Sequence, residues 1–142
     1  MGSRRKGRIL AMQALYAWEM THADCEELCR FAWLGEKQLS SYDESTRRFS
    51  RMLVYGAIER MDDVDAAISK NLEHWNFDRI AKVDLAVLRL GVYSLLYQTD
   101  IPATVTIDEA VEIAKEYAGE ESYRFVNGIL DGVRKKAVRS GG

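Results

Sequence analysis

The stretch VDLAVLRLGVYSLLY, residues 83–97, is apolar on nearly every side of a helical wheel. The main interruptions are Asp84, Arg89, Gly91 and Ser94. A helix with so few polar positions is stable only where other elements surround it. The stretch therefore predicts the most buried helix of the protein and the centre of its fold.

The only proline of the chain, Pro102, follows this central stretch. The residue before a proline is pushed out of helical geometry, so Asp100-Ile101-Pro102 is expected to end the central helix. The next helix begins either near Pro102 or at Thr106, which forms a capping-box pattern with Glu109. Ala118-Gly119 is typical of the C-cap of that helix.

Apolar residues recur three and four positions apart through the rest of the chain, and no strand pattern exceeds a few residues. Hydrophobic residues make up 47% of the 142 residues, enough for one core. The sequence thus predicts an all-α protein with a single domain over residues 1–142. Two helices are expected at residues 4–20 and at residues 24–37, the second with Asp24 as N-cap. The inner faces of the later helices are expected at Phe49, Met52, Leu53 and Gly56, at Val64, Ala67, Ile68 and Leu72, at Ile107, Ala110, Val111, Ala114 and Tyr117, and at Val126, Ile129, Leu130 and Val133.

Composition and motifs exclude several classes of protein. Twenty basic residues against 22 acidic ones give a formal charge of −2, so a nucleic-acid signal has to come from local clustering. The sequence has no leader peptide pattern and no apolar run as long as a membrane span, which predicts a cytoplasmic protein without a membrane partner. It also has no nucleophile elbow, no metalloprotease motif and no phosphate-binding glycine loop. We therefore expect neither an enzyme nor a cofactor.

One small group of residues suggests a metal site. Cys25 and Cys29 stand four residues apart, close to His22. Structural zinc takes four ligands, and the sequence has no second pair of cysteines or histidines. We therefore expect no metal and interpret the two thiols as residues of one helix face in a reducing compartment.

A run of basic residues opens the first predicted helix: Arg4, Arg5, Lys6 and Arg8. Such a run is most often solvated surface. At a helix N-terminus, however, the macrodipole is already positive, so cations there are mildly unfavourable. That cost is easier to understand if an anion binds. The run is therefore either solvated surface or a phosphate contact.

A second candidate segment spans residues 120–128. With Val126 on the inner stripe, a helical wheel places Phe125 and Asn127 on opposite flanks of that stripe. The Phe125 ring could stack on a base, Arg124 could hold a phosphate, and the Asn127 amide could hydrogen-bond to a base edge. Single-stranded RNA binding uses these three kinds of contact. The alternative is that Phe125 is a residue at the rim of the core and Asn127 caps or links helices.

Gly128 and Gly132 lie four residues apart within the same predicted helix. A glycine inside a helix costs roughly 1 kcal/mol relative to alanine. The pair therefore predicts the close approach of another backbone, either from a packed helix or from a ligand.

Several blocks together resemble a known family. They are RRKGR (4–8) with AMQALYAWE (11–19), WNFDRI (75–80), VLRLGVY (87–93) with Ile101-Pro102, DEAVEIAK (108–115) and FVNGILD (125–131). In this order they resemble the transcription antitermination protein NusB family over the whole chain.

The resemblance implies a compact fold of about seven helices in two three-helix bundles. It also implies binding of boxA-type single-stranded RNA together with NusE, a small-subunit ribosomal protein. That complex joins the elongating RNA polymerase through partners and suppresses premature termination, notably in ribosomal RNA operons. Since some family members pair into dimers, a homodimer stays open.

The resemblance also assigns roles to individual residues. Arg4, Arg5, Lys6 and Arg8 would hold phosphates. Asp78 and Asp84 would face the basic ribosomal protein, an arrangement that steers association. The base-contacting surface would consist of Gln13, Tyr16, Tyr123, Arg124, Phe125 and Asn127.

Two other functions compete with RNA binding. A similar domain precedes a ribosomal RNA cytosine methyltransferase in some proteins, so the chain could be a stand-alone helical interaction module of that kind. No cofactor-binding βα pattern follows the helices here. A purely structural protein with a basic solubilising tail is the other alternative.

Overall fold

The computed structural model describes residues 2–73 and 76–141, with side chains as far as residue 137. Within these residues the only regular elements are helices, which confirms the all-α prediction. Trp75, which begins one of the family-like blocks, lies outside the described residues. The elements are α1 (Ser3–Thr21), α2 (Cys25–Leu28), α3 (Glu36–Ser40), α4 (Glu44–Glu59), α5 (Met61–Ser69), the 3₁₀ turn η1 (Phe77–Arg79), α6 (Lys82–Tyr97), α7 (Ala103–Tyr117) and α8 (Glu120–Gly141).

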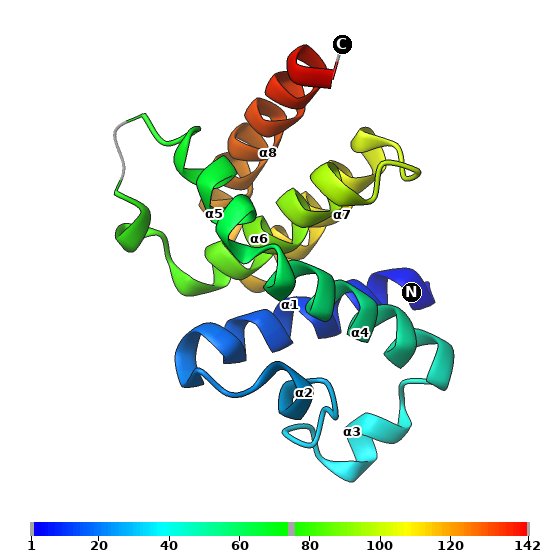
Figure 1. Ribbon diagram of the computed structural model, residues 1–142. Helices are drawn as coiled ribbons and strands as arrows, with labels where there is room; N and C mark the ends of the chain where they lie inside the picture. Colours follow the sequence, from blue (N-terminus) through cyan, green and yellow to red (C-terminus); the bar gives the residue numbers. More distant parts are fainter. Residues whose placement is uncertain (1, 74–75, 142) are drawn as a thin grey trace.

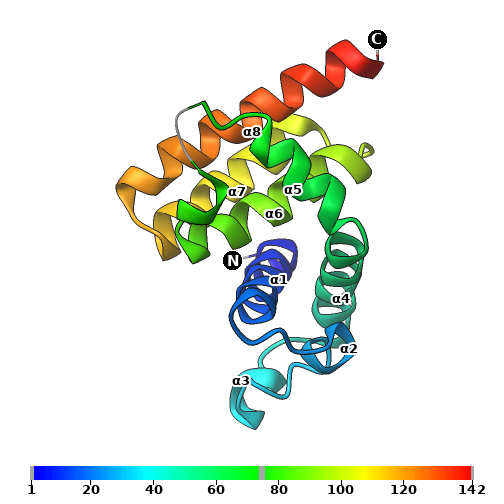
Figure 2. The same ribbon diagram turned by 60° about the vertical axis from the view of Figure 1, so that its left-hand side comes forward.

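The central helix is α6, as its sequence predicts. Residues 84–92 of α6 are all buried. The helix packs against α1, α4, α5, α7 and α8 (Figure 1). Figure 2 shows α1 to α4 on one side of the molecule and α5 to α8 on the other. The two groups implied by the resemblance are therefore present, with α1, α2 and α4 in one and α6, α7 and α8 in the other.

The predicted helix over residues 24–37 is wrong. Asp24 does cap a helix, since its carboxylate accepts the backbone N–H of Glu26 at 3.4 Å, but α2 ends at Leu28. The chain then reverses at Phe31, which is fully buried and has a φ of 57°. Burial of this ring holds the backbone in a left-handed conformation that a helix cannot contain. The segment therefore forms two short helices, α2 and α3.

Two predicted inner-face residues lie at the surface instead. Met52 is 50% exposed and Tyr117 is 41% exposed. On α4 the small polar residues Thr46 and Ser50 are buried, because the inner face is rotated toward them and away from Met52. A search for apolar spacing overlooks such residues, since it counts them as outward-facing.

For the two glycines of the last helix, the predicted approach of a packed backbone is wrong, and the approach of a ligand stays a prediction. A Cβ at Gly128 would meet no atom of the described residues within 4 Å, so no neighbouring helix among them approaches it. A Cβ at Gly132 would lie 2.3 Å from Oδ1 of Asn71, which is a side chain and not a backbone. The predicted inner stripe of α8 is correct, because Val126, Ile129, Leu130 and Val133 are all buried.

The turns around α7 fix the start of α8. Pro102 is the N-cap of α7, which decides between the two starting points that the sequence allowed. Ala118 is its C-cap, and Gly119 follows with a φ of 107°, as expected of a helix end. The backbone N–H groups of both residues donate to the carbonyl of Ala114. After this tight turn, α8 packs against α7.

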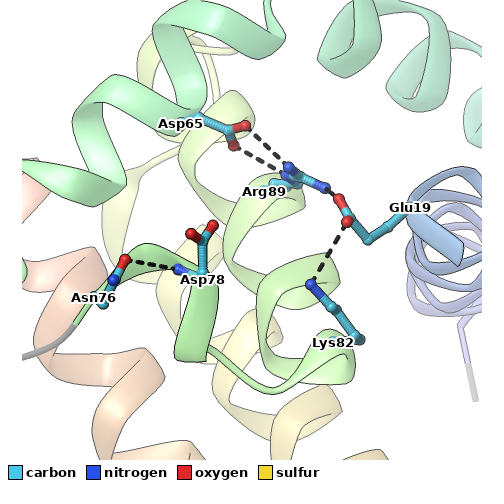
Figure 3. A network of polar contacts seen from close by, with 6 residues as sticks. All are labelled: Glu19, Asp65, Asn76, Asp78, Lys82 and Arg89. Carbon is cyan, nitrogen blue, oxygen red and sulfur yellow. Dashed lines mark hydrogen bonds and ion pairs between the residues drawn. The ribbon is translucent and has the colours of Figure 1, made fainter.

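Arg89 of α6 joins α1 and α5 through a buried ion network (Figure 3). Its side chain is 5% exposed. It donates to both carboxylate oxygens of Asp65 at 2.9 Å and to Glu19 at 2.7 Å. Burial by itself raises the pKa of Glu19, but the hydrogen bond and charge of Arg89, with Lys82 3.5 Å away, outweigh it and lower that pKa. The network therefore keeps charged groups between packed helices without leaving the arginine uncompensated.

No helix in the described part of the chain is both long and apolar enough to cross a bilayer.

Candidate nucleic-acid interface

The predicted phosphate-binding residues occupy the first two turns of α1. Arg4 and Lys6 are exposed, whereas Arg5 and Arg8 are partly buried. The guanidinium carbons of Arg4 and Arg8 lie 4.5 and 5.6 Å from the ring centroid of Phe49 on α4. Burial lowers the pKa of Arg8, which stays far above neutrality. No carboxylate occupies the first turn of α1, so the helix dipole and the basic side chains add to one positive end.

Arg5 has a protein partner. Its Nε and Nη2 donate to the two carboxylate oxygens of Glu109 on α7, at 2.8 and 3.2 Å. These hydrogen bonds raise the pKa of Arg5 and hold the pKa of Glu109 below its usual range. The pair joins α1 to α7, so Arg5 has a structural role whether or not it also contacts a phosphate.

Gln13 and Tyr16, two turns further along α1, line a surface groove of about 590 Å³. Val83 of α6 and Tyr117 of α7 form part of its wall, and so does Trp33, which is 41% exposed. Tyr16 is itself 37% exposed. The groove thus offers several aromatic side chains to a flat ligand.

Tyr123 and Arg124 lie in the first turns of α8, beside the end of α7. The ammonium of Lys115 is 4.8 Å from the ring centroid of Tyr123, and the guanidinium carbon of Arg124 is 5.9 Å from it. These residues line a groove of about 570 Å³ together with Glu120 and Glu121. The ring therefore lies between two cations, one from each helix.

Phe125 is partly buried, as the helical wheel indicates, and Asn127 is exposed. One part of the Phe125 ring packs against the hydrophobic core. Another part lines a smaller groove of about 280 Å³, opposite Ala81 and Asp84. Both alternatives for Phe125 thus describe part of its position, because it belongs to the rim of the core and also borders a groove.

The structure separates the two acidic residues that were expected to face a partner protein. Asp78 is exposed in η1, and its backbone N–H is capped by Oδ1 of Asn76 at 3.2 Å (Figure 3). Asp84 is only 8% exposed in the first turn of α6, and its Oδ1 has no hydrogen-bond partner among the described residues. Burial raises the pKa of Asp84, opposed in part by a hydrogen bond from Ser122. Asp84 therefore lies at the bottom of the groove that Phe125 borders.

Two of the three grooves adjoin each other, because Glu121 lines both the Tyr123 groove and the Phe125 groove. Val83 lines the α1 groove and Asp84 lines the Phe125 groove. Tyr117 lines the α1 groove, while Lys115, on the same turn of α7, lines the Tyr123 groove. Neighbouring residues of α6 and of α7 thus line different grooves, with the α1 residues in one groove and the α8 residues in the other two.

Sequence reasoning missed several members of this surface. Tyr117 was expected inside the protein, and Lys115, Trp33 and Glu109 were given no role at the surface. One signal was available, the acidic Glu109 in a capping-box pattern. A carboxylate in that pattern that does not cap its helix can pair with a nearby arginine. Trp33 gave no local signal, since its position depends on the reversal at Phe31.

No group of three metal-ligating side chains comes together within the described residues. Burial raises the pKa of Cys29 to about 12, and it also raises that of Cys25. Both cysteines are free thiols. At neutral pH they are protonated and are poor nucleophiles and poor metal ligands.

Comparison with known proteins identifies relatives over nearly the whole chain. The model of the NusB family matches residues 5–135. The transcription antitermination protein NusB of Treponema denticola is 44% identical over 134 residues, which cover 94% of this chain and 97% of the relative.

Two solved structures have the same arrangement of helices. NusB of T. maritima superimposes with a TM-score of 0.82 at 41% identity, covering 93% of this chain and 90% of that one. A crystal structure of the antitermination factors NusB and NusE in complex with double-stranded RNA contains a chain with a TM-score of 0.84 at 26% identity. That match covers 96% of this chain and 98% of the other.

Proposed function

The chain belongs to the NusB family, and on this premise we propose that it is a transcription antitermination factor. It binds a boxA-type single strand of RNA together with the ribosomal protein NusE. The complex joins RNA polymerase through its partners and helps the enzyme to pass terminators, notably in ribosomal RNA operons. The role is one of binding and assembly in the cytoplasm, without catalysis.

One observation carries the proposal: aromatic and basic side chains from α1, α7 and α8 line grooves at the surface of the protein. Single-stranded RNA is bound by side chains on which bases stack and by cations that follow the backbone. In the proposal, Arg4, Lys6 and Arg8 hold phosphates at the positive end of α1. Tyr16, Tyr123 and Phe125 supply ring faces, and Gln13, Arg124 and Asn127 supply hydrogen bonds.

In the proposal, two acidic residues bind the ribosomal protein. Asp78 is exposed on η1, and Asp84 lies in the Phe125 groove a short distance along the chain. A basic partner that inserts a cation beside Asp84 would supply the hydrogen bond that its Oδ1 lacks. RNA and protein would then meet at Phe125, which supports joint binding of the two.

The test is a binding titration with three RNAs: a boxA-type single strand, its scrambled version and a boxA-type duplex. Each is measured across a salt series, with and without NusE. We expect preference for the boxA-type single strand, stronger in the presence of NusE. We also expect a log–log salt slope of about −0.7 for each phosphate contacted. Equal weak binding of all three RNAs under every condition would contradict the proposal, and preference for the duplex would correct the form of RNA.

A further inference from the structure

A second basic surface lies where the first turns of α1 and α4 meet. We call it the α1–α4 surface and define it by six residues: Arg4, Lys6, Arg8, Arg47, Arg48 and Arg51. Six of the 20 basic residues of the chain thus stand together, with Asp43, Glu44 and Glu109 as the neighbouring acids. The whole chain has a formal charge of −2, so this end of the molecule is positive and the rest of the protein is acidic.

Phe49 organises this surface. It is partly buried against the core, so its ring is held in place. A Cβ at Gly7 would lie only 2.6 Å from the ring, which shows how closely α1 and α4 approach here. The guanidinium groups of Arg4 and Arg8 both lie against the ring. A cation held on an aromatic face loses less side-chain freedom when an anion binds it.

The nearby carboxylates are already engaged. Asp43 accepts the backbone N–H of Thr46 at 2.7 Å as the N-cap of α4. Glu44 pairs with Arg51 at 2.6 Å and with Arg47 at 3.4 Å. Arg48 is exposed and forms no ion pair among the described residues. Arg4, Lys6 and Arg48 are therefore the exposed cations of this surface that have no ion pair among the described residues, and Arg4 and Arg48 line a common groove.

A groove of about 250 Å³ runs between these two arginines. Ser3 and Ser45 line it with hydroxyl groups, and Met52 adds an apolar edge. It lies beside the first turns of both helices, whose dipoles favour negative charge. A string of phosphates fits this combination of charge and hydroxyl groups better than an acidic peptide does, because the arginines follow the groove edge instead of forming one deep pocket.

We propose that RNA nucleotides flanking the boxA-type element continue over α4, with a phosphate held between Arg4 and Arg48. This inference rests on the proposed function and extends its RNA path from the α1 groove to the opposite side of the α1 N-terminus. Phe49 is a positioning residue that holds Arg4 and Arg8 toward the RNA backbone. The contact is with the RNA backbone and is therefore independent of sequence.

The experiment compares Arg48→Gln with the native protein on two RNAs. One is the minimal boxA-type strand, and the other is the same strand extended at both ends by uridines. Arg48→Lys serves as the charge-conserving variant. Lys70→Gln removes an equally exposed charge at the C-cap of α5. Thermal unfolding of each variant shows that the fold is retained.

On the extended strand we expect the salt slope of Arg48→Gln to be smaller by about 0.7, equivalent to one lost phosphate contact. Raising the salt from about 50 to about 200 mM then weakens the native protein about threefold more than the variant. The minimal strand should bind both proteins equally, while Arg48→Lys and Lys70→Gln should keep the native slope.

Equal slopes of the native protein and Arg48→Gln on the extended strand would overturn the inference, and so would an equal loss on the minimal strand. Failure of the proposed function would give a different result, because the native protein would then bind boxA-type and scrambled RNA equally. An extension effect that depends on Arg48 without boxA preference would support the α1–α4 surface and reject the proposed function.

Discussion

At the scale of single residues, Phe125 has two environments. Part of its ring packs against the core and part borders the groove that contains Asp84. Substitution by alanine should weaken RNA binding by about 1 to 3 kcal/mol, the usual contribution of an aromatic side chain on which a base stacks. Fluorescence anisotropy with a boxA-type strand measures this loss.

Phe125→Leu separates the two environments, because leucine keeps most of the apolar contact but has no π face. We expect this variant to remain stable in urea unfolding and to bind RNA nearly as weakly as the alanine variant. Native affinity in Phe125→Leu would show that the ring serves packing alone.

The buried carboxyl of Asp84 should make stability depend on pH. Burial raises its pKa in the folded state above the unfolded value of about 3.9. The folded protein then prefers the protonated form, so the penalty is absent below the unfolded pKa and appears as the pH rises through the folded pKa. Asp84→Asn should therefore raise the Tm at pH 7.

This gain should shrink as the pH is lowered toward 3.9, where the native carboxyl is protonated in both states. Asp108→Asn, an exposed change on α7, is the control and should leave the Tm nearly unchanged at each pH. A Tm for Asp84→Asn below that of the native protein at pH 7 would mean that the carboxylate has a partner that compensates for its burial.

At the scale of elements, the two glycines of α8 should respond to alanine in opposite directions. Gly128 faces open space, so alanine should stabilise the protein by up to about 1 kcal/mol through its higher helix propensity. Gly132 lies against the Asn71 amide, so alanine there should displace this amide from its hydrogen bond to the Ala67 carbonyl and destabilise the protein. Urea unfolding of both variants measures the difference.

Gly128→Ala also tests for close contact with RNA. If RNA approaches the α8 backbone beside Asn127, the more stable variant should bind RNA more weakly. Unchanged RNA binding would show that Gly128 is not at the interface, and a destabilised protein would contradict the open position of the residue.

Arg89 joins three helices, so its loss should affect the packing of all three. Arg89→Leu leaves Asp65 without a cation and leaves Glu19 with only its longer pair to Lys82, at 3.5 Å. We expect a loss of about 3 kcal/mol, at the lower end for a broken buried pair, because the side chains of both carboxylates remain about a quarter exposed. Denaturant unfolding at neutral pH measures it.

Arg134→Gln is the matched control, because the side chains of its pair with Asp131, on one face of α8, are 37% and 34% exposed, whereas that of Arg89 is 5% exposed. That change should cost less than about 1 kcal/mol. Equal effects of the two substitutions would mean that the Arg89 network contributes no more than a surface ion pair.

At the scale of the whole molecule, α6 packs in both halves of the protein. Neither half can bury its apolar surface without this helix, so the halves should not unfold separately. We therefore predict one cooperative thermal transition in which the calorimetric and van't Hoff enthalpies agree. Two transitions, or a calorimetric enthalpy well above the van't Hoff value, would contradict the prediction of a single domain over residues 1–142.

The candidate surface was only partly predictable. The basic run of α1 and the flanking position of Phe125 follow from local spacing, because the position of a residue along a helix determines the side on which its side chain lies. The grooves could not be predicted, because each is lined by residues from several helices. Tyr117 shows the difference: its spacing indicates the inner face of α7, but at the end of that helix it is 41% exposed.

The sequence by itself determined the all-α class, the central position of residues 83–97 and the inner stripe of α8. These depend on periodicity and on helix-ending residues, which act within one element. Only the tertiary structure decided the reversal at Phe31, the ion network of Arg89 and the meeting of Arg4 with Phe49 and Arg48. Each of these depends on burial or charge shared between elements distant in sequence, and no local pattern records which elements will meet.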